Sequence, residues 1–143
     1  MSTILIGIDP GVKTGVGAID GKNKVVGSMP IHQAMQFVSD IADKNLPIHI
    51  RVEDARLRKW FGNNAKAKQQ GAGSVKRDCK IWEDFLSDIK ATTNSDISFE
   101  MVHPVKGGTK INAKMFQQIT GIQKRTSEHA RDAYMLIHNF RRR

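Results

Sequence analysis

The 143-residue sequence has only one cysteine and no long apolar run. These two shortages argue against a disulfide-bonded protein, a cysteine-based zinc site and a membrane-spanning protein. A single thiol, Cys79, forms neither an intramolecular disulfide nor a zinc cluster, so a reducing cytoplasm is the simplest setting. No segment reaches the roughly 18 apolar residues of a membrane-spanning helix, and no basic n-region of a signal peptide is evident. We therefore expect a cytoplasmic protein that does not enter a membrane, with one domain over residues 1–143.

Acidic residues are also scarce relative to basic ones. The chain has 23 Lys and Arg against 14 Asp and Glu, for a formal net charge of +9. For so short a chain, this bias predicts a polyanionic partner, either nucleic acid or an anionic membrane surface. The alternative is a basic surface that is simply solvated.

Apolar residues recur with the spacing of a strand in some segments of the chain and with the spacing of a helix in others. Strands are predicted over residues 3–8, 14–19, 24–29, 48–52 and 97–102. Helices are predicted over residues 31–44, 75–90, 112–119 and 127–140. This order predicts an α/β fold with a five-stranded mixed sheet flanked by helices, in which the first three strands are antiparallel and the last two are parallel.

Carboxylates stand at the ends of two of these strands. The run ILIGIDPG at residues 4–11 is apolar on both faces, as in a central strand, and Asp9 ends it. A carboxylate there is costly unless a cation compensates it. Glu53, with Asp54 beside it, ends the fourth strand. Because these two strands should be parallel, their carboxyl ends meet at one edge of the sheet, where ligands bind in such folds.

The last helix adds two more candidate ligands. His129 and Asp132 are three residues apart, so they lie on one helical face, and that face is close to the apolar arc. We therefore expect both to face the sheet. Together with Asp9 and Glu53 they form a site suited to Mg²⁺ or Mn²⁺. The alternatives are ordinary structural roles: Asp9 capping its turn, Glu53 in a surface ion pair, Asp132 in a helical pair, and His129 as a buried, hydrogen-bonded histidine.

Four motifs occur in a known order: IDPG, then TGVGAI, then VED, and finally HARDA. Together they resemble the RuvC-type Holliday junction resolvases, especially small phage-like members, across essentially the whole chain. The resemblance implies the ribonuclease H-like (retroviral integrase) fold. It also implies a homodimeric, divalent-metal-dependent crossover junction endodeoxyribonuclease that cuts four-way DNA junctions in a bacterial cell, with host and phage both open as the source of the gene.

The resemblance also implies a role for each candidate residue. Asp9 matches the aspartate that bridges two Mg²⁺ or Mn²⁺ ions, while Glu53 and Asp132 match the other carboxylate ligands. His129 matches a position where members carry aspartate or histidine, which ligates a metal or positions the attacking water. The VED motif leaves Glu53 and Asp54 as alternatives, and Glu53 is favoured because it directly follows an apolar residue.

The family fold implies a nucleic-acid strand laid across this edge of the sheet. Basic residues that flank the edge in the sequence are the expected phosphate contacts: Arg56, Arg58, Lys59, Lys76, Arg77, Lys106, Lys110, Lys114, Lys124 and Arg125. Trp60 and Phe61 either wedge between unstacked bases or pack against the helix at 75–90 or a partner subunit. That helix itself is a candidate for the dimer interface as well as for the core.

Three other functions remain open at this level. The same fold hosts YqgF-like ribonucleases and enzymes that cleave RNA–DNA hybrids, although YqgF-like chains carry a DER motif after the fourth strand where this chain has EDAR. The DPGVKTG segment loosely resembles the phosphate hairpin of actin-like ATP-binding domains, but the chain has no room for their second domain. The last possibility is a binding-only junction protein.

Overall fold

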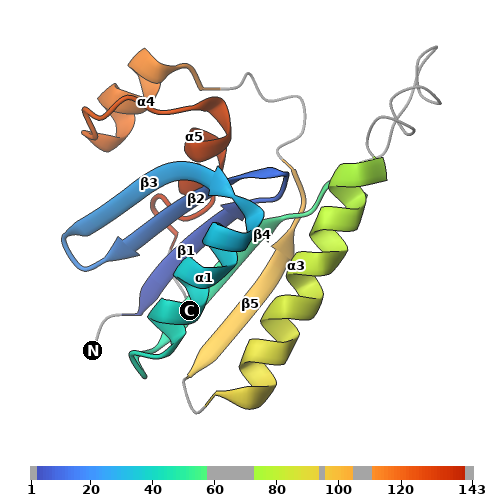
Figure 1. The fold of residues 1–143 in the computed structure, drawn as a ribbon. Coiled ribbons are helices and arrows are strands. Elements are labelled where there is room, and N and C mark those ends of the chain that lie inside the picture. The colour runs from blue at the N-terminus through green and yellow to red at the C-terminus, as the bar shows by residue number, and fades with distance from the viewer. Residues whose placement is uncertain (1–2, 58–72, 94–95, 105–110, 141–143) are drawn as a thin grey trace.

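In the computed structural model, the described residues are 3–57, 73–93, 96–104 and 111–140. They form a five-stranded sheet with helices on both faces (Figure 1). The strands are β1 (Ile4–Asp9), β2 (Lys13–Asp20), β3 (Asn23–Pro30), β4 (Ile48–Glu53) and β5 (Ile97–Val102). The helices are α1 (Ile31–Ala42), the short 3₁₀ helix η1 (Ala55–Leu57), α3 (Gly73–Thr92), α4 (Ala113–Thr120) and α5 (Glu128–Met135).

The sheet is mixed, as the sequence predicts. Its strand order is β3-β2-β1-β4-β5. The β1–β2 and β2–β3 pairs are antiparallel, whereas β4 runs parallel to both β1 and β5. The predicted α/β class and strand arrangement are therefore confirmed. None of the described helices has both the length and the apolar character needed to cross a membrane.

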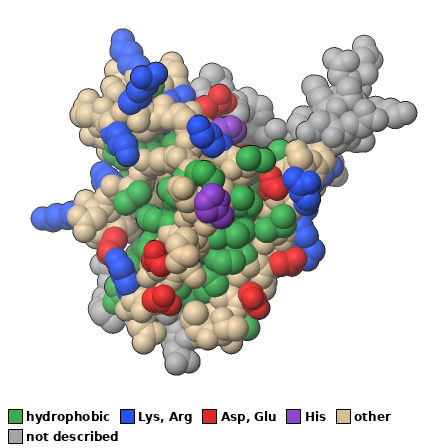
Figure 2. All heavy atoms as spheres, viewed as in Figure 1, with side chains coloured by type: hydrophobic (Ala, Val, Ile, Leu, Met, Phe, Trp, Pro, Cys, Tyr) green, Lys and Arg blue, Asp and Glu red, His purple; other side chains and the backbone are tan. Residues whose placement is uncertain are grey.

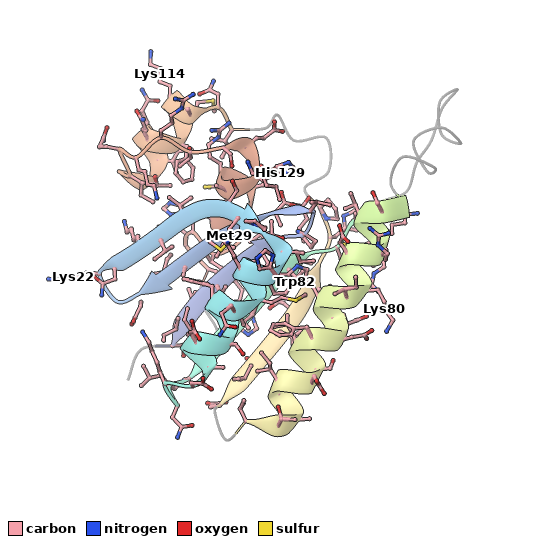
Figure 3. The ribbon with its side chains drawn as sticks, in the orientation of Figure 1. Lys22, Met29, Lys80, Trp82, Lys114 and His129 are labelled. Atoms are coloured by element: carbon pink, nitrogen blue, oxygen red, sulfur yellow. The ribbon has the colours of Figure 1, made fainter. Side chains whose placement is uncertain are left out.

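Strand alternation divides the side chains of the sheet between two layers. On one face, alternate residues of β1 and β4, such as Ile6 and Ile50, pack with α1 and α3 into the main core. Trp82 and Leu86 of α3 are completely buried there, so they belong to the core rather than to an exposed interface. Figure 3 shows Trp82 on the inner side of α3 and Lys80 pointing away from it. The other face of the sheet carries α5, which contacts β1, β2 and β3.

Glycines let α5 lie directly on the sheet. Gly7 of β1 and Gly17 of β2 are register partners, and Gly15 pairs with Asp9. A Cβ atom added to Gly7 would lie 2.0 Å from the carbonyl oxygen of Ala133, and one added to Gly15 would lie 2.0 Å from that of His129. Any side chain at these positions would therefore collide with the helix backbone. The glycines thus determine how closely α5 can approach the sheet.

The last helix is shorter than predicted. It begins after Ser127, whose side chain accepts a hydrogen bond from the Ala130 backbone N–H, but it ends at Met135 instead of residue 140. Arg51 Nη1 donates a hydrogen bond of 2.6 Å to the Leu136 carbonyl, and Asn139 has a positive φ of 62°. Past Met135 the chain continues in hydrogen-bonded turns instead of a regular α-helix. The other predicted bounds are within two residues of those observed.

Candidate metal centre

The carboxylates of Asp9, Glu53 and Asp132 come together at one edge of the sheet. Each offers an oxygen atom, and these atoms all lie within 4.8 Å of one another. Asp9 and Glu53 are the last residues of β1 and β4, whose parallel register runs as far as the Ile8–Val52 pair. Because both follow residues that face α1 and α3, they point to the opposite face, where α5 brings Asp132. The sequence prediction that these carboxylates converge agrees with this geometry.

The separation and chemistry of these oxygens fit a hard divalent cation. Oxygen ligands on opposite sides of an ion are about 4.2 Å apart around Mg²⁺ and about 4.8 Å apart around Ca²⁺. The three oxygens, within 4.8 Å of one another, thus span a distance that one cation can bridge. An all-carboxylate set suits Mg²⁺, Mn²⁺ or Ca²⁺ better than a thiolate-preferring metal. The cluster could bind a metal, and a cation there would relieve the repulsion among three carboxylates.

His129 lies beside this cluster, but its environment differs from the prediction. Its Nδ1 atom is 3.0 Å from Asp9 Oδ2, within hydrogen-bonding distance. The His129 side chain is 56% exposed, whereas that of Asp9 is 14% exposed. Figure 3 shows His129 on α5. The expectation that it faces inward is therefore wrong in part: His129 belongs to the first turn of α5, where its ring reaches Asp9 from the solvent side. It is also not a buried structural histidine.

The structure separates the two neighbouring acids of the VED motif. Glu53 lies in the carboxylate cluster, whereas the Asp54 side chain is 3% exposed and pairs with Arg56. Burial of Asp54 opposes its ionisation, but the hydrogen bonds and charge of Arg56 outweigh this effect, so the pKa of Asp54 lies below its ordinary value. Of the two alternatives, Glu53 is therefore the one in position to contact a cation.

Arg56 is held within the protein rather than projecting freely towards a ligand. Its guanidinium donates to both carboxylate oxygens of Asp54, at 2.8 Å each, and to Glu83 Oε1 at 3.1 Å. Three of its five N–H donors are thus engaged by two carboxylates, and whether Arg56 also contacts a phosphate stays a prediction. The nearby Arg51 of β4 donates to the Leu136 carbonyl at the end of α5 and pairs with Glu100.

The other predicted nucleic-acid contacts are only partly described. Lys76 is half-buried at the start of α3, while Arg77, Lys114, Lys124 and Arg125 are exposed. In the view of Figure 2, Lys and Arg side chains stand over α4 and along α3. Arg58, Lys59, Lys106 and Lys110 lie outside the described residues, as do Trp60 and Phe61.

Two features that shape this site were missed by the sequence reasoning. The first is the glycine set Gly7, Gly15 and Gly17, which fixes the height of α5 above the sheet. Its signal was present, because Gly15 and Gly17 are two residues apart on one face of a predicted strand. The second is the pairing of Asp54 with Arg56, for which the EDAR sequence offers two residues at a suitable spacing but no indication that they are buried.

Comparison with known proteins adds no assignment to this geometry. No family model matches the chain, and no curated protein matches it. The functional argument therefore depends on the residues themselves and on their arrangement.

Proposed function

We propose that this protein is a divalent-metal-dependent, structure-selective endodeoxyribonuclease that resolves four-way DNA junctions in the bacterial cytoplasm. The observation that carries the proposal is the convergence of Asp9, Glu53 and Asp132, whose oxygens lie within 4.8 Å of one another. Bound by these carboxylates, two Mg²⁺ or Mn²⁺ ions would activate water and stabilise the leaving oxygen of a phosphodiester. His129 is also available, because its ring contacts Asp9 from the solvent side.

The topology supports a ribonuclease H-like assignment. Three antiparallel strands are followed by two parallel ones, in the order β3-β2-β1-β4-β5. The acidic residues are on the first strand, the fourth strand and the last helix, which is where the resolvase resemblance expects them. Fold alone does not assign a reaction, and the proposal therefore depends on the carboxylates as well.

The site residues would have different roles in such a reaction. Asp9 and Glu53 would hold the cations from the ends of two paired strands, and Asp132 would do so from α5. His129 Nδ1 is hydrogen-bonded to Asp9, which orients the ring at the rim of the site, where an imidazole can accept a proton from water or hold that water in place.

Positive charge supports a nucleic-acid substrate. The net charge of +9 predicts a salt-dependent attraction to phosphates. Exposed Arg77 on α3, and Lys114, Lys124 and Arg125 on and after α4, are available to contact a DNA backbone. A homodimer with two such sites would cut symmetric strands of a junction, because its two-fold axis matches that of the substrate.

The direct test is a cleavage assay on matched substrates. The purified protein is incubated with a labelled four-way junction, a linear duplex of the same sequence, an RNA–DNA hybrid and a structured RNA, each with and without Mg²⁺. We expect Mg²⁺-dependent cleavage of the junction in preference to the duplex. Faster cleavage of the hybrid or of the RNA would instead identify a ribonuclease on the same fold.

The matched variant is Asp132→Asn, which removes one negative charge and keeps the size of the side chain. We expect it to lose cleavage and to retain junction binding in a gel-shift assay, since the basic residues are untouched. Normal junction cleavage by this variant would refute the assignment of the site.

A further inference from the structure

We infer that Arg56 is a positioning residue for Glu53, acting through the ion pairs it makes with Asp54 and Glu83, and that it is not a phosphate contact. These three residues form the Asp54–Arg56–Glu83 clamp. The inference rests on the proposed metal-dependent function, because it assigns the clamp a role in cation binding.

The clamp connects the end of β4 to α3. Arg56 Nε and Nη2 donate to the two carboxylate oxygens of Asp54, each at 2.8 Å, in the bidentate arrangement that suits a guanidinium. The Arg56 backbone N–H also donates to Asp54 Oδ1 at 3.0 Å, which folds the chain tightly after the strand. Arg56 Nη1 reaches Glu83 Oε1 at 3.1 Å. Residues 27 positions apart are thereby tied together at the point where β4 ends.

The contacts around the clamp restrain Glu53 itself. The Asp54 backbone N–H donates to the Val102 carbonyl at 2.8 Å, which continues the β4–β5 pairing one residue past Glu53. On the other side, Cys79 Sγ of α3 lies 3.7 Å from the Glu53 carbonyl oxygen. Glu53 is thus followed directly by a buried residue that Arg56 anchors, and a shift of this segment relative to β5 and α3 would disturb the Val102 hydrogen bond and the Arg56–Glu83 ion pair.

A lysine cannot replace this arginine without loss. One ammonium group cannot donate in parallel to both oxygens of Asp54 and also reach Glu83, because those bonds come from separate nitrogens of a rigid fork. Arg56→Lys therefore keeps the charge next to the site and removes the geometry. Groups that orient metal ligands in this way typically change metal affinity by about 10- to 100-fold when they are altered.

The test measures Mn²⁺ affinity and does not depend on cleavage. Free Mn²⁺ is followed by electron paramagnetic resonance during titration of the wild type, Arg56→Lys and Glu83→Gln, at a temperature where all are folded. We expect the dissociation constant to rise at least about 10-fold in Arg56→Lys. In Glu83→Gln, which keeps the Asp54–Arg56 pair, we expect a rise of about 3-fold. If Arg56→Lys does not fold, the second variant decides.

A destabilised control separates positioning from general loss of stability. Leu86→Ala and Ile89→Val weaken the core side of the same helix without touching the clamp. The control is the variant of these two whose melting temperature is closest to that of Arg56→Lys. We expect this control to bind Mn²⁺ with the wild-type dissociation constant. Wild-type Mn²⁺ affinity in both clamp variants would overturn the inference, as would an equal loss in the control. If the wild type binds Mn²⁺ no better than Asp132→Asn, it is the proposed metal centre that fails.

Discussion

Replacing Gly15 with alanine should disrupt the carboxylate cluster more than it disrupts the fold. The new Cβ would lie 2.0 Å from the His129 carbonyl oxygen, whereas ordinary contact begins near 3.4 Å. Relief of this overlap requires a movement of about 1.4 Å, the difference between those two distances. The Cβ is fixed to the β2 backbone and the oxygen belongs to the α5 backbone, so the strand and the helix must separate, which shifts His129 and Asp132 relative to Asp9 and Glu53. Metal ligands tolerate only about 0.2 Å of error.

The expected cost follows from what overpacking does in cores. We expect Gly15→Ala to lower the free energy of unfolding by about 1–3 kcal/mol. For a domain of this size that corresponds to a fall of about 3–12 °C in melting temperature. Bound Mn²⁺ at 100 times its dissociation constant should stabilise the wild type by about 2.7 kcal/mol, and most of this gain should be absent in the variant.

Thermal unfolding by circular dichroism, with and without Mn²⁺, measures both effects. Gly27→Ala is the matched control, because Gly27 is in the same sheet and an added Cβ meets no described atom within 4 Å. The free energy of unfolding of Gly27→Ala should be within about 1 kcal/mol of the wild-type value, because alanine mainly reduces the conformational freedom of the unfolded chain. This variant should also keep the full stabilisation by Mn²⁺. If Gly15→Ala melts and responds to Mn²⁺ as the wild type does, then α5 does not depend on this glycine.

Three further predictions concern α5 and the buried groups behind the site. Tyr134 is the only tyrosine, its hydroxyl has no hydrogen-bond partner among the described residues, and burial raises its pKa. The free energy of unfolding of Tyr134→Phe should therefore equal that of the wild type or exceed it by up to about 1 kcal/mol. Because the unfolded tyrosine ionises near its ordinary pKa of about 10, the wild type alone should lose stability from this group above that pH, as followed by absorbance at 295 nm; an equal alkaline loss in the variant would contradict this. Cys79 is the only cysteine, and burial raises its pKa to about 11, so a thiol reagent near neutral pH should label it only in denaturant; rapid labelling of the native protein would disagree. Ser127→Ala should cost about 1 kcal/mol in urea denaturation, because it removes the N-cap of α5; an unchanged midpoint would show that this cap is dispensable.

The strands and their carboxylates could be predicted because the relevant signals are local. The apolar run before Asp9 and the predicted strand before Glu53 each specify a strand end within a residue or two. Parallel strands then require Asp9 and Glu53 to share an edge. The helical spacing of Asp132 could likewise be read from one turn of sequence.

The features that escaped prediction are contacts between distant segments. Arg51 ends α5 through the carbonyl of Leu136, which is 85 residues away in the chain. Asn139, with its positive φ, is a local signal for the end of the helix, but the contact with Arg51 has no local signal in residues 127–140. The exposure of His129 is a similar case, because its helical face was right but its height relative to the strand ends depends on how α5 sits on Gly15.

The placement of the carboxylates has a consequence for synthesis of the protein. Asp9 and Glu53 are encoded in β1 and β4, and the third member, Asp132, follows 79 residues after Glu53, on α5. A nascent or truncated chain without α5 holds only two of the three carboxylates. The centre is thus assembled last, and a chain that stops early in translation or is cleaved before α5 would lack it.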